Sequence, residues 1–313
     1  MKRDSSGKSE PGICESRITS PESRSVRLCV ESKIAITMAF KQYVRAEIAA
    51  GLDETYQFET WAADAPGREY YDVHLSVIEE RETCVPTLRR VLAGGGKRIL
   101  ESGCGTGRWM AFFERLGHRA VGVDDSAGPL RVARAHDAAL RLVRADTLAC
   151  PFKDGSFDAV FSSYVAEHFE DGPAALLREL RRLLTPGGLL LLIVPYNNLL
   201  RRVFTHRILE LYGLLRRVRG GRMAFTEFRF SAGEIAQLVE RSGFRVEHTE
   251  PDDFHLPWGK GLSLDLGPLV LQKPGGWELN GFGRLLGRAL RALSPWTGAA
   301  GILIVARAAA PIR

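Results

Sequence analysis

The sequence predicts an α/β fold, a mostly parallel sheet with helices on both faces, from two observations. Short apolar runs at 98–100, 119–123, 142–144, 157–162 and 188–195 alternate with helical patterns at 109–116, 127–140 and 174–184. Strands separated by helices run parallel through crossover connections. A glycine-rich turn joins the first strand to the first helix, as in many doubly wound sheets. A helix at 231–241 and strands at 244–249 and 302–306 complete the pattern.

The composition is that of a soluble globular protein. The 313 residues are 45% hydrophobic and 26% charged, and the net charge of +6 does not by itself indicate nucleic-acid binding. The five cysteines are scattered, which argues against a disulfide framework and a metal site. The longest apolar run, 189–194, is too short to span a membrane, and the N-terminus lacks a signal-peptide pattern. We therefore expect a cytoplasmic protein.

Three regions follow from the patterns along the chain. Residues 1–37 are polar and charged without an apolar period, which predicts a disordered tail. Residues 38–93 read as a helical N-terminal region or cap that includes the aromatic residues Tyr56, Phe58 and Trp61. Residues 94–313 form one α/β domain with insertions at 199–230 and 252–296.

The turn itself reads Glu-Ser-Gly-Cys-Gly-Thr-Gly from Glu101 to Gly107. Glycines accept positive φ and let a ligand approach the main chain, and the following helix presents unpaired N–H groups. The G-x-G-x-G spacing differs from the G-x-G-x-x-G of dinucleotide sites and from the phosphate-binding P-loop. A tight turn without a ligand remains an alternative for this stretch taken alone.

Carboxylates end the next two strands of the pattern. Asp124 follows 119–123 directly, and Asp146 follows 142–144. A carboxylate at the first position can accept hydrogen bonds from both hydroxyls of a ribose. The alternative is a helix cap, a role that suits Asp125 or Ser126 better than Asp124.

Together these motifs resemble the class I S-adenosylmethionine (SAM)-dependent methyltransferases of the methyltransferase type 11 kind. Cys-Pro-Phe-Lys-Asp-Gly-Ser-Phe-Asp-Ala-Val at 150–160 is similar to the family's L-P-F-x-D-x-S-F-D-x-V, and Thr-Pro-Gly-Gly at 185–188 matches the loop before the fifth strand. The resemblance covers about residues 97–195. Glu101 stands where the family often has Asp, and Ala166 where it often has Leu.

The resemblance implies a Rossmann-like, seven-stranded, mostly parallel sheet with a C-terminal antiparallel edge hairpin, and SAM as cofactor. Glu101 would hold the methionine end, Asp124 the ribose and Asp146 the adenine amine. The complete set of expected cofactor residues is Glu101, Gly103, Cys104, Gly105, Gly107, Asp124, Asp125, Asp146, Thr147 and Ser163.

The expected reaction is in-line transfer of a methyl group to an oxygen or nitrogen atom, in which the protein mainly supplies proximity and orientation. His168 is the candidate general base, because its ordinary pKa lies near neutral pH. The alternative is that the Glu167–His168 pair only supports its loop. Tyr164, Tyr196 and Asn197, near strand ends, are weaker candidates.

The acceptor is sought in the insertions. Residues 199–222 carry seven arginines and one glutamate, with apolar residues at near-helical spacing. Such a segment fits an anionic membrane surface, and a lid helix is the alternative. We expect a small-molecule, saccharide or lipid-linked acceptor and peripheral membrane association. RNA or protein methylation, or SAM binding without catalysis, remain alternatives, although no RNA-binding module is recognisable, which argues against nucleic acid.

Overall fold

The computed structural model describes residues 39–45, 69–266, 271, 273 and 278–309. The predicted tail at 1–37 lies outside the described residues. So do Tyr56, Phe58 and Trp61 of the expected aromatic cluster.

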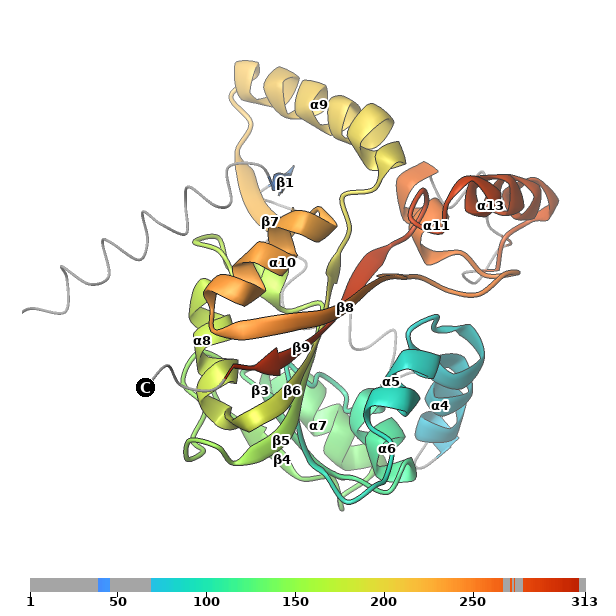
Figure 1. Cartoon of the computed structure of the whole chain (residues 1–313). Coiled ribbons are helices and arrows are strands. Elements are labelled where there is room, and N and C mark those ends of the chain that lie inside the picture. Colours follow the sequence, from blue (N-terminus) through green and yellow to red (C-terminus); the bar gives the residue numbers. More distant parts are fainter. Residues whose placement is uncertain (1–38, 46–68, 267–270, 272, 274–277, 310–313) are drawn as a thin grey trace, which may run out of the picture.

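A seven-stranded sheet forms the centre of the described chain, in the order β4-β3-β2-β5-β6-β9-β8 (Figure 1). All neighbours pair in parallel except β9, which runs antiparallel to both β6 and β8. The predicted mostly parallel sheet with a C-terminal antiparallel hairpin is therefore confirmed. The strands are β2 (Arg98–Ser102), β3 (Arg119–Asp124), β4 (Leu142–Arg144), β5 (Phe157–Ser163), β6 (Leu184–Pro195), β8 (Phe244–Asp252) and β9 (Gly301–Ala308).

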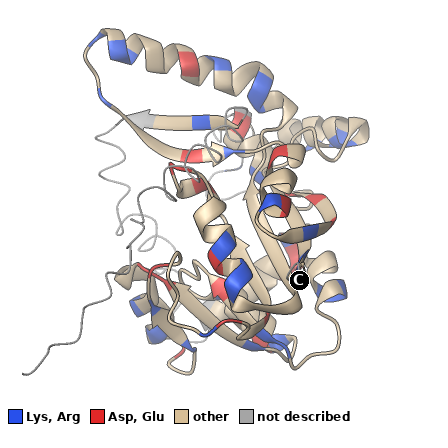
Figure 2. Cartoon of the chain, turned by 60° about the vertical axis from the view of Figure 1, so that its left-hand side comes forward, with Lys and Arg blue, Asp and Glu red and all other residues tan. Residues whose placement is uncertain are grey.

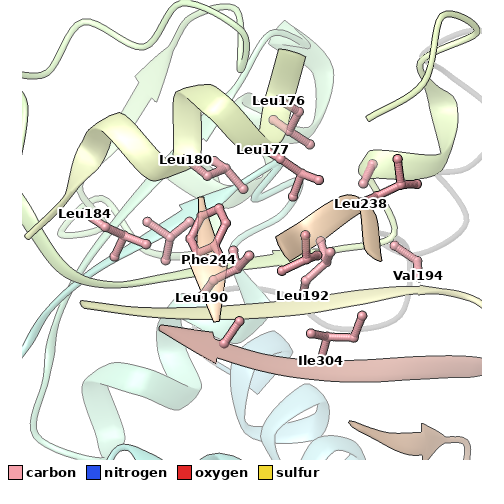
Figure 3. Packing of buried hydrophobic residues seen from close by; sticks show 14 of the residues in the cluster. Leu176, Leu177, Leu180, Leu184, Leu190, Leu192, Val194, Leu238, Phe244 and Ile304 are labelled. Atoms are coloured by element: carbon pink, nitrogen blue, oxygen red, sulfur yellow. The ribbon is translucent and has the colours of Figure 1, made fainter. Parts of the chain in front are cut away.

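Helices bury both faces of this sheet, which explains the continuous apolar run in β6. Leu190 and Leu192 face one cluster with α8 and α10, whereas Leu191 and Ile193 face the other cluster with α4 to α7. Figure 3 shows the first cluster, where the leucines of α8 meet those of β6. The helices are α4 (Glu69–Arg81), α5 (Val85–Val91), α6 (Arg108–Arg115), α7 (Ala127–His136), α8 (Ala174–Leu183) and α10 (Ala232–Arg241).

Helix α7 is shorter than expected. The apolar pattern predicts a helix to Leu140, but α7 ends at His136. Asp137 has extended backbone angles, and its carboxylate accepts a hydrogen bond from the Ala139 amide at 2.8 Å. This local side-chain bond competes with continuation of the helix.

A second, two-stranded sheet corrects the expected helical reading of residues 38–93. Strand β1 (Phe40–Arg45) pairs antiparallel with β7 (Met223–Arg229), which lies in the first insertion. The prediction of a helical conformation was therefore wrong for residues 40–45. The strand depends on a partner far away in the sequence, and local patterns do not reveal such a partner.

Helical segments also form in the described part of the two insertions. The first insertion holds a π-helical turn, η2 (Arg201–Thr205), that continues into α9 (His206–Val218), and the second holds α11 (Lys260–Leu266) and α13 (Gly281–Leu293). A small apolar cluster around Leu262 and Leu279 joins the two insertions, because Leu200 packs against it. Within the described ranges, every helix falls short of the length and apolar content needed to cross a bilayer.

The glycine turn after β2 requires glycine for two different reasons. Gly103 and Gly105 both have positive φ, 74° and 51°. A Cβ atom on Gly103 would lie 2.2 Å from Cγ2 of Val165, whereas a Cβ atom on Gly105 would meet open space. The loop after β5 therefore packs directly on the turn at Gly103.

We expect Gly103→Ala to destabilise the protein more than Gly105→Ala. Both substitutions incur the cost of a left-handed alanine, about 1–2 kcal/mol. Gly103→Ala adds overpacking against Val165, roughly 1–3 kcal/mol more. Urea unfolding of the two variants measures the difference in the free energy of unfolding. Equal losses would mean that Val165 does not constrain the turn.

Candidate active site

The turn after β2 is hydrogen-bonded to the end of β3. The amides of Gly103 and Cys104 both donate to the carbonyl of Val123, at 2.8 and 3.0 Å. The Gly105 amide donates to one oxygen of the Asp124 carboxylate at 2.8 Å, and the Ser126 amide donates to the other at 2.9 Å. Asp124 therefore links the glycine turn to the start of α7.

Asp124 differs sharply from its neighbour Asp125. Burial raises the pKa of Asp124, and the two amide donors oppose that shift. The Asp125 side chain is exposed, and its backbone carbonyl accepts a hydrogen bond from Arg144 Nε. Of the two acids, only Asp124 is hydrogen-bonded to the turn.

Glu101, at the carboxyl end of β2, is a buried acid with an unused oxygen. Its residue is 3% exposed, and burial raises its pKa well above the ordinary value, while Arg108 and the Met110 amide act in the opposite direction. Among the described residues, its Oε2 has no hydrogen-bond partner. A cationic ligand placed here would satisfy that oxygen. With the open space beside Gly105, these residues fit the methionine part of SAM.

The other residues expected at the cofactor lie along the same edge of the sheet. Asp146 and Thr147 follow β4, Asp146 is exposed, and its Oδ1 accepts from the Leu148 amide at 2.8 Å. Ser163 is the last residue of β5, and Gly107 precedes α6 with φ of 76°. All follow carboxyl ends of parallel strands, where ligands bind in such sheets.

His168 lies in the short 3-10 helix η1 (Ala166–His168) that follows β5. Its side chain is 54% exposed, and its Nδ1 lies 2.9 Å from the carbonyl oxygen of Thr226 in β7. A carbonyl can only accept, so Nδ1 carries the proton of the neutral ring, and Nε2 keeps a lone pair. Glu167, beside it, is buried, and burial raises the pKa of that carboxyl well above its usual value.

A buried polar cluster lies where sequence analysis did not place one. Tyr164 follows β5 with a positive φ of 56°, and its hydroxyl donates to Asp252 Oδ2 at 3.1 Å. Asp252 ends β8, which runs in the same direction as β5, so both reach the same edge. The Lys260 ammonium lies 3.9 Å from the Tyr164 ring centroid, and the Glu82 carboxylate lies 3.7 Å from Arg108.

The sequence held one signal for this cluster. Asp252 and Asp253 come after the strand expected at 244–249, with two residues between, but the sequence alone does not place that strand beside Tyr164. Burial raises the pKa values of Glu82, Tyr164 and Asp252. Ligand atoms of Glu82, Cys84 and Asp252 lie within 4.8 Å of one another, but burial keeps the Cys84 thiol protonated by raising its pKa. That protonation weakens the cluster as a metal site.

A cavity of about 570 Å³ lies elsewhere, between β1, β7 and α9. Its walls include Phe40, Tyr43, Leu209, Met223 and Phe228. None of its lining residues belongs to the glycine turn or to the acids along the sheet edge. The cavity is therefore separate from the expected cofactor position.

Comparison with known proteins identifies a methyltransferase domain in this part of the chain. Residues 100–192 match the family model described as a methyltransferase domain. The malonyl-[acyl-carrier protein] O-methyltransferase of Serratia marcescens is 38% identical over 96 residues, covering 31% of this chain and 38% of the relative. The demethylmenaquinone methyltransferase of Clavibacter sepedonicus is 39% identical over 117 residues, covering 36% and 47%. The chain thus spans less than half the length of these relatives.

The fold has a counterpart among solved structures. A chain from the complex between the Haloferax volcanii Trm112 methyltransferase activator and a proposed methyltransferase superimposes with a TM-score of 0.55. The match has 20% identity and covers 83% of this chain and 100% of that one, so it bears on the fold alone. The sequence matches support a methyltransferase domain of the class I, SAM-dependent kind within residues 100–192, and the overall fold is compatible with one.

Proposed function

We propose that the protein transfers a methyl group from SAM to an oxygen or nitrogen atom of a small-molecule, saccharide or lipid-associated acceptor. The observation that carries the proposal is the bonding of Asp124 to Gly105 at the carboxyl edge of the sheet, beside the unpaired oxygen of Glu101. Matched relatives are named for malonyl-acyl-carrier-protein and demethylmenaquinone acceptors, which supports a small or carrier-bound acceptor.

Each part of the turn has a proposed role in holding SAM. Glu101 binds the ammonium of the methionine part, with the Gly103 and Gly105 backbone beside it. Asp124 accepts hydrogen bonds from the ribose hydroxyls through the remaining lone pairs of its two carboxylate oxygens. Asp146 and the Thr147 amide contact the adenine. When bound, SAM supplies an electrophilic methyl group on a positively charged sulfur.

We expect Asp124→Ala to weaken SAM binding strongly and Asp125→Ala to leave it nearly unchanged. The first substitution removes the ribose acceptor and the bond to Gly105, which together correspond to about 2–3 kcal/mol, or roughly 30- to 150-fold in affinity. Calorimetric titration with SAM and S-adenosylhomocysteine measures both variants against wild type.

Asp125 belongs to the set expected from the sequence, but it is the matched control here because its side chain is exposed and its backbone carbonyl accepts a hydrogen bond from Arg144 instead of from the turn. Equal effects of the two substitutions would remove the proposed ribose role of Asp124. No binding of either ligand by the folded wild-type protein would remove the methyltransferase proposal itself.

His168 is the proposed general base for an acceptor that loses a proton. The Thr226 carbonyl holds the ring in the tautomer that leaves the Nε2 lone pair available, and the half-exposed position allows an acceptor to reach it. The Thr226 contact also ties η1 to β7, which would position the ring relative to the strand.

We expect His168→Asn to slow methyl transfer without changing cofactor affinity. The Asn amide can still donate to the Thr226 carbonyl, but it has no basic nitrogen, so the rate should fall by about 10²–10⁴-fold. Transfer of tritium from methyl-labelled SAM into bacterial lipid and aqueous extracts measures the rate. Wild-type rates in this variant would assign His168 a supporting role only.

The Tyr164–Asp252 pair is the proposed wall of the acceptor site. It lies at the same sheet edge as the turn, since the next residue, Val165, contacts Gly103. Strained non-glycine residues such as Tyr164 cluster at functional sites. The Asp252 Oδ1 atom has no partner among the described residues, and a ligand group would satisfy it.

We expect Tyr164→Phe to lower kcat/KM for the acceptor about tenfold or more, because it leaves Asp252 without its hydroxyl donor. SAM affinity should stay within about twofold, since Tyr164 is not part of the proposed cofactor contacts. The same labelled-methyl assay, with varied acceptor extract, measures the ratio. Tyr212→Phe, on the outer part of α9, is the control, and an identical result in both variants would contradict the assignment.

A further inference from the structure

Helix α9 presents an apolar face to solvent. Its inner side carries His206, Leu209 and Gly213, which are buried or partly buried toward β1 and β7. Its opposite side carries five large apolar residues whose exposed fractions run from 48% to 78%. We name this set the α9 stripe: Phe204, Ile208, Leu211, Leu215 and Val218. The spacing of four and three residues places them on one side of a helix.

Cations surround the α9 stripe. Arg202, Arg207, Arg219 and Arg222 are exposed on or next to the helix, whereas Arg217 lies over the Tyr43 ring on the inner side. Figure 2 shows basic segments along α9, whose sequence contains one acid, Glu210. That acid, Glu210, lies 3.1 Å from Arg207 and offsets one charge. The stripe is therefore apolar at its centre and positive at its margins.

The start of the helix is held in a fixed direction. Arg201 and Asp265 form a buried ion pair between η2 and α11, and Asn198 also donates to Asp265, at 2.6 Å. Leu200 packs into the small cluster shared with α13. Because these contacts anchor η2, the stripe cannot turn inward without breaking a buried ion pair.

We propose that the α9 stripe binds the surface of a membrane containing anionic phospholipid, with the helix lying in the plane of the interface. Apolar side chains enter the boundary of the acyl region, and the flanking arginines remain with the phosphate groups. A second copy of this chain fits less well, because it would bring two sets of arginines together. The inference does not depend on methyl transfer.

The test is cosedimentation with vesicles of phosphatidylcholine alone and of an equal mixture with phosphatidylglycerol. We expect the wild-type protein to bind the mixed vesicles at least about tenfold more strongly, and less strongly as salt increases. Ile208→Asp with Leu215→Asp should reduce this binding by about tenfold or more. Val73→Asp, at an exposed apolar position on α4, should not change it.

Equal binding to the two vesicle types, or unchanged binding by the Ile208→Asp, Leu215→Asp protein, would overturn the proposal. Sedimentation velocity without vesicles tests the second copy: a wild-type dimer that the paired substitutions dissociate would assign the stripe to self-association instead. Calorimetry with S-adenosylhomocysteine should give wild-type affinity for both variants. This measurement separates the loss of a membrane contact from the loss of the fold. If the wild-type protein does not bind S-adenosylhomocysteine, the proposed methyltransferase function is contradicted, but the membrane proposal is not.

Discussion

The bonding of one turn to the neighbouring strand governs the arrangement of the sheet edge. The Val123 carbonyl and the Asp124 carboxylate accept the amides of three consecutive residues of the turn, Gly103 to Gly105. This geometry needs a positive φ at Gly103, and it needs a residue without a side chain there because Val165 packs against that position. The turn, the end of β3 and the loop after β5 are therefore positioned together.

Buried acids around this turn carry an electrostatic cost that the described chain only partly offsets. Glu101, Glu167 and Asp252 each keep an oxygen without a hydrogen-bond partner among the described residues, and burial raises the pKa of each. Unsatisfied buried polar atoms are uncommon in folded proteins. Cationic or hydrogen-bonding ligands at the carboxyl edge would satisfy the oxygens of these three acids.

Sequence patterns could predict the sheet and the turn because each depends on local signals. Short apolar runs predict the strands β2 to β6. The glycine turn directly follows β2 in the sequence, and Asp124 lies at the end of β3. The pairing of β1 with β7 and the approach of Asp252 to Tyr164 depend on contacts between distant segments. The weak local pattern of residues 40–45 is compatible with a helix, and only the partner strand decides otherwise.

The two insertions add a separate layer of structure beside the sheet, and a buried ion pair sets its direction. A buried ion pair such as Arg201–Asp265 rarely adds stability over apolar residues of the same size. Its effect here is directional, since it fixes the start of α9 against α11. One side of α9 then covers the cavity beside β1 and β7, and the other side remains apolar in solvent. The inner side of α9 is covered by protein, and the exposed apolar stripe on the other side is the part of the helix for which lipid is the proposed partner.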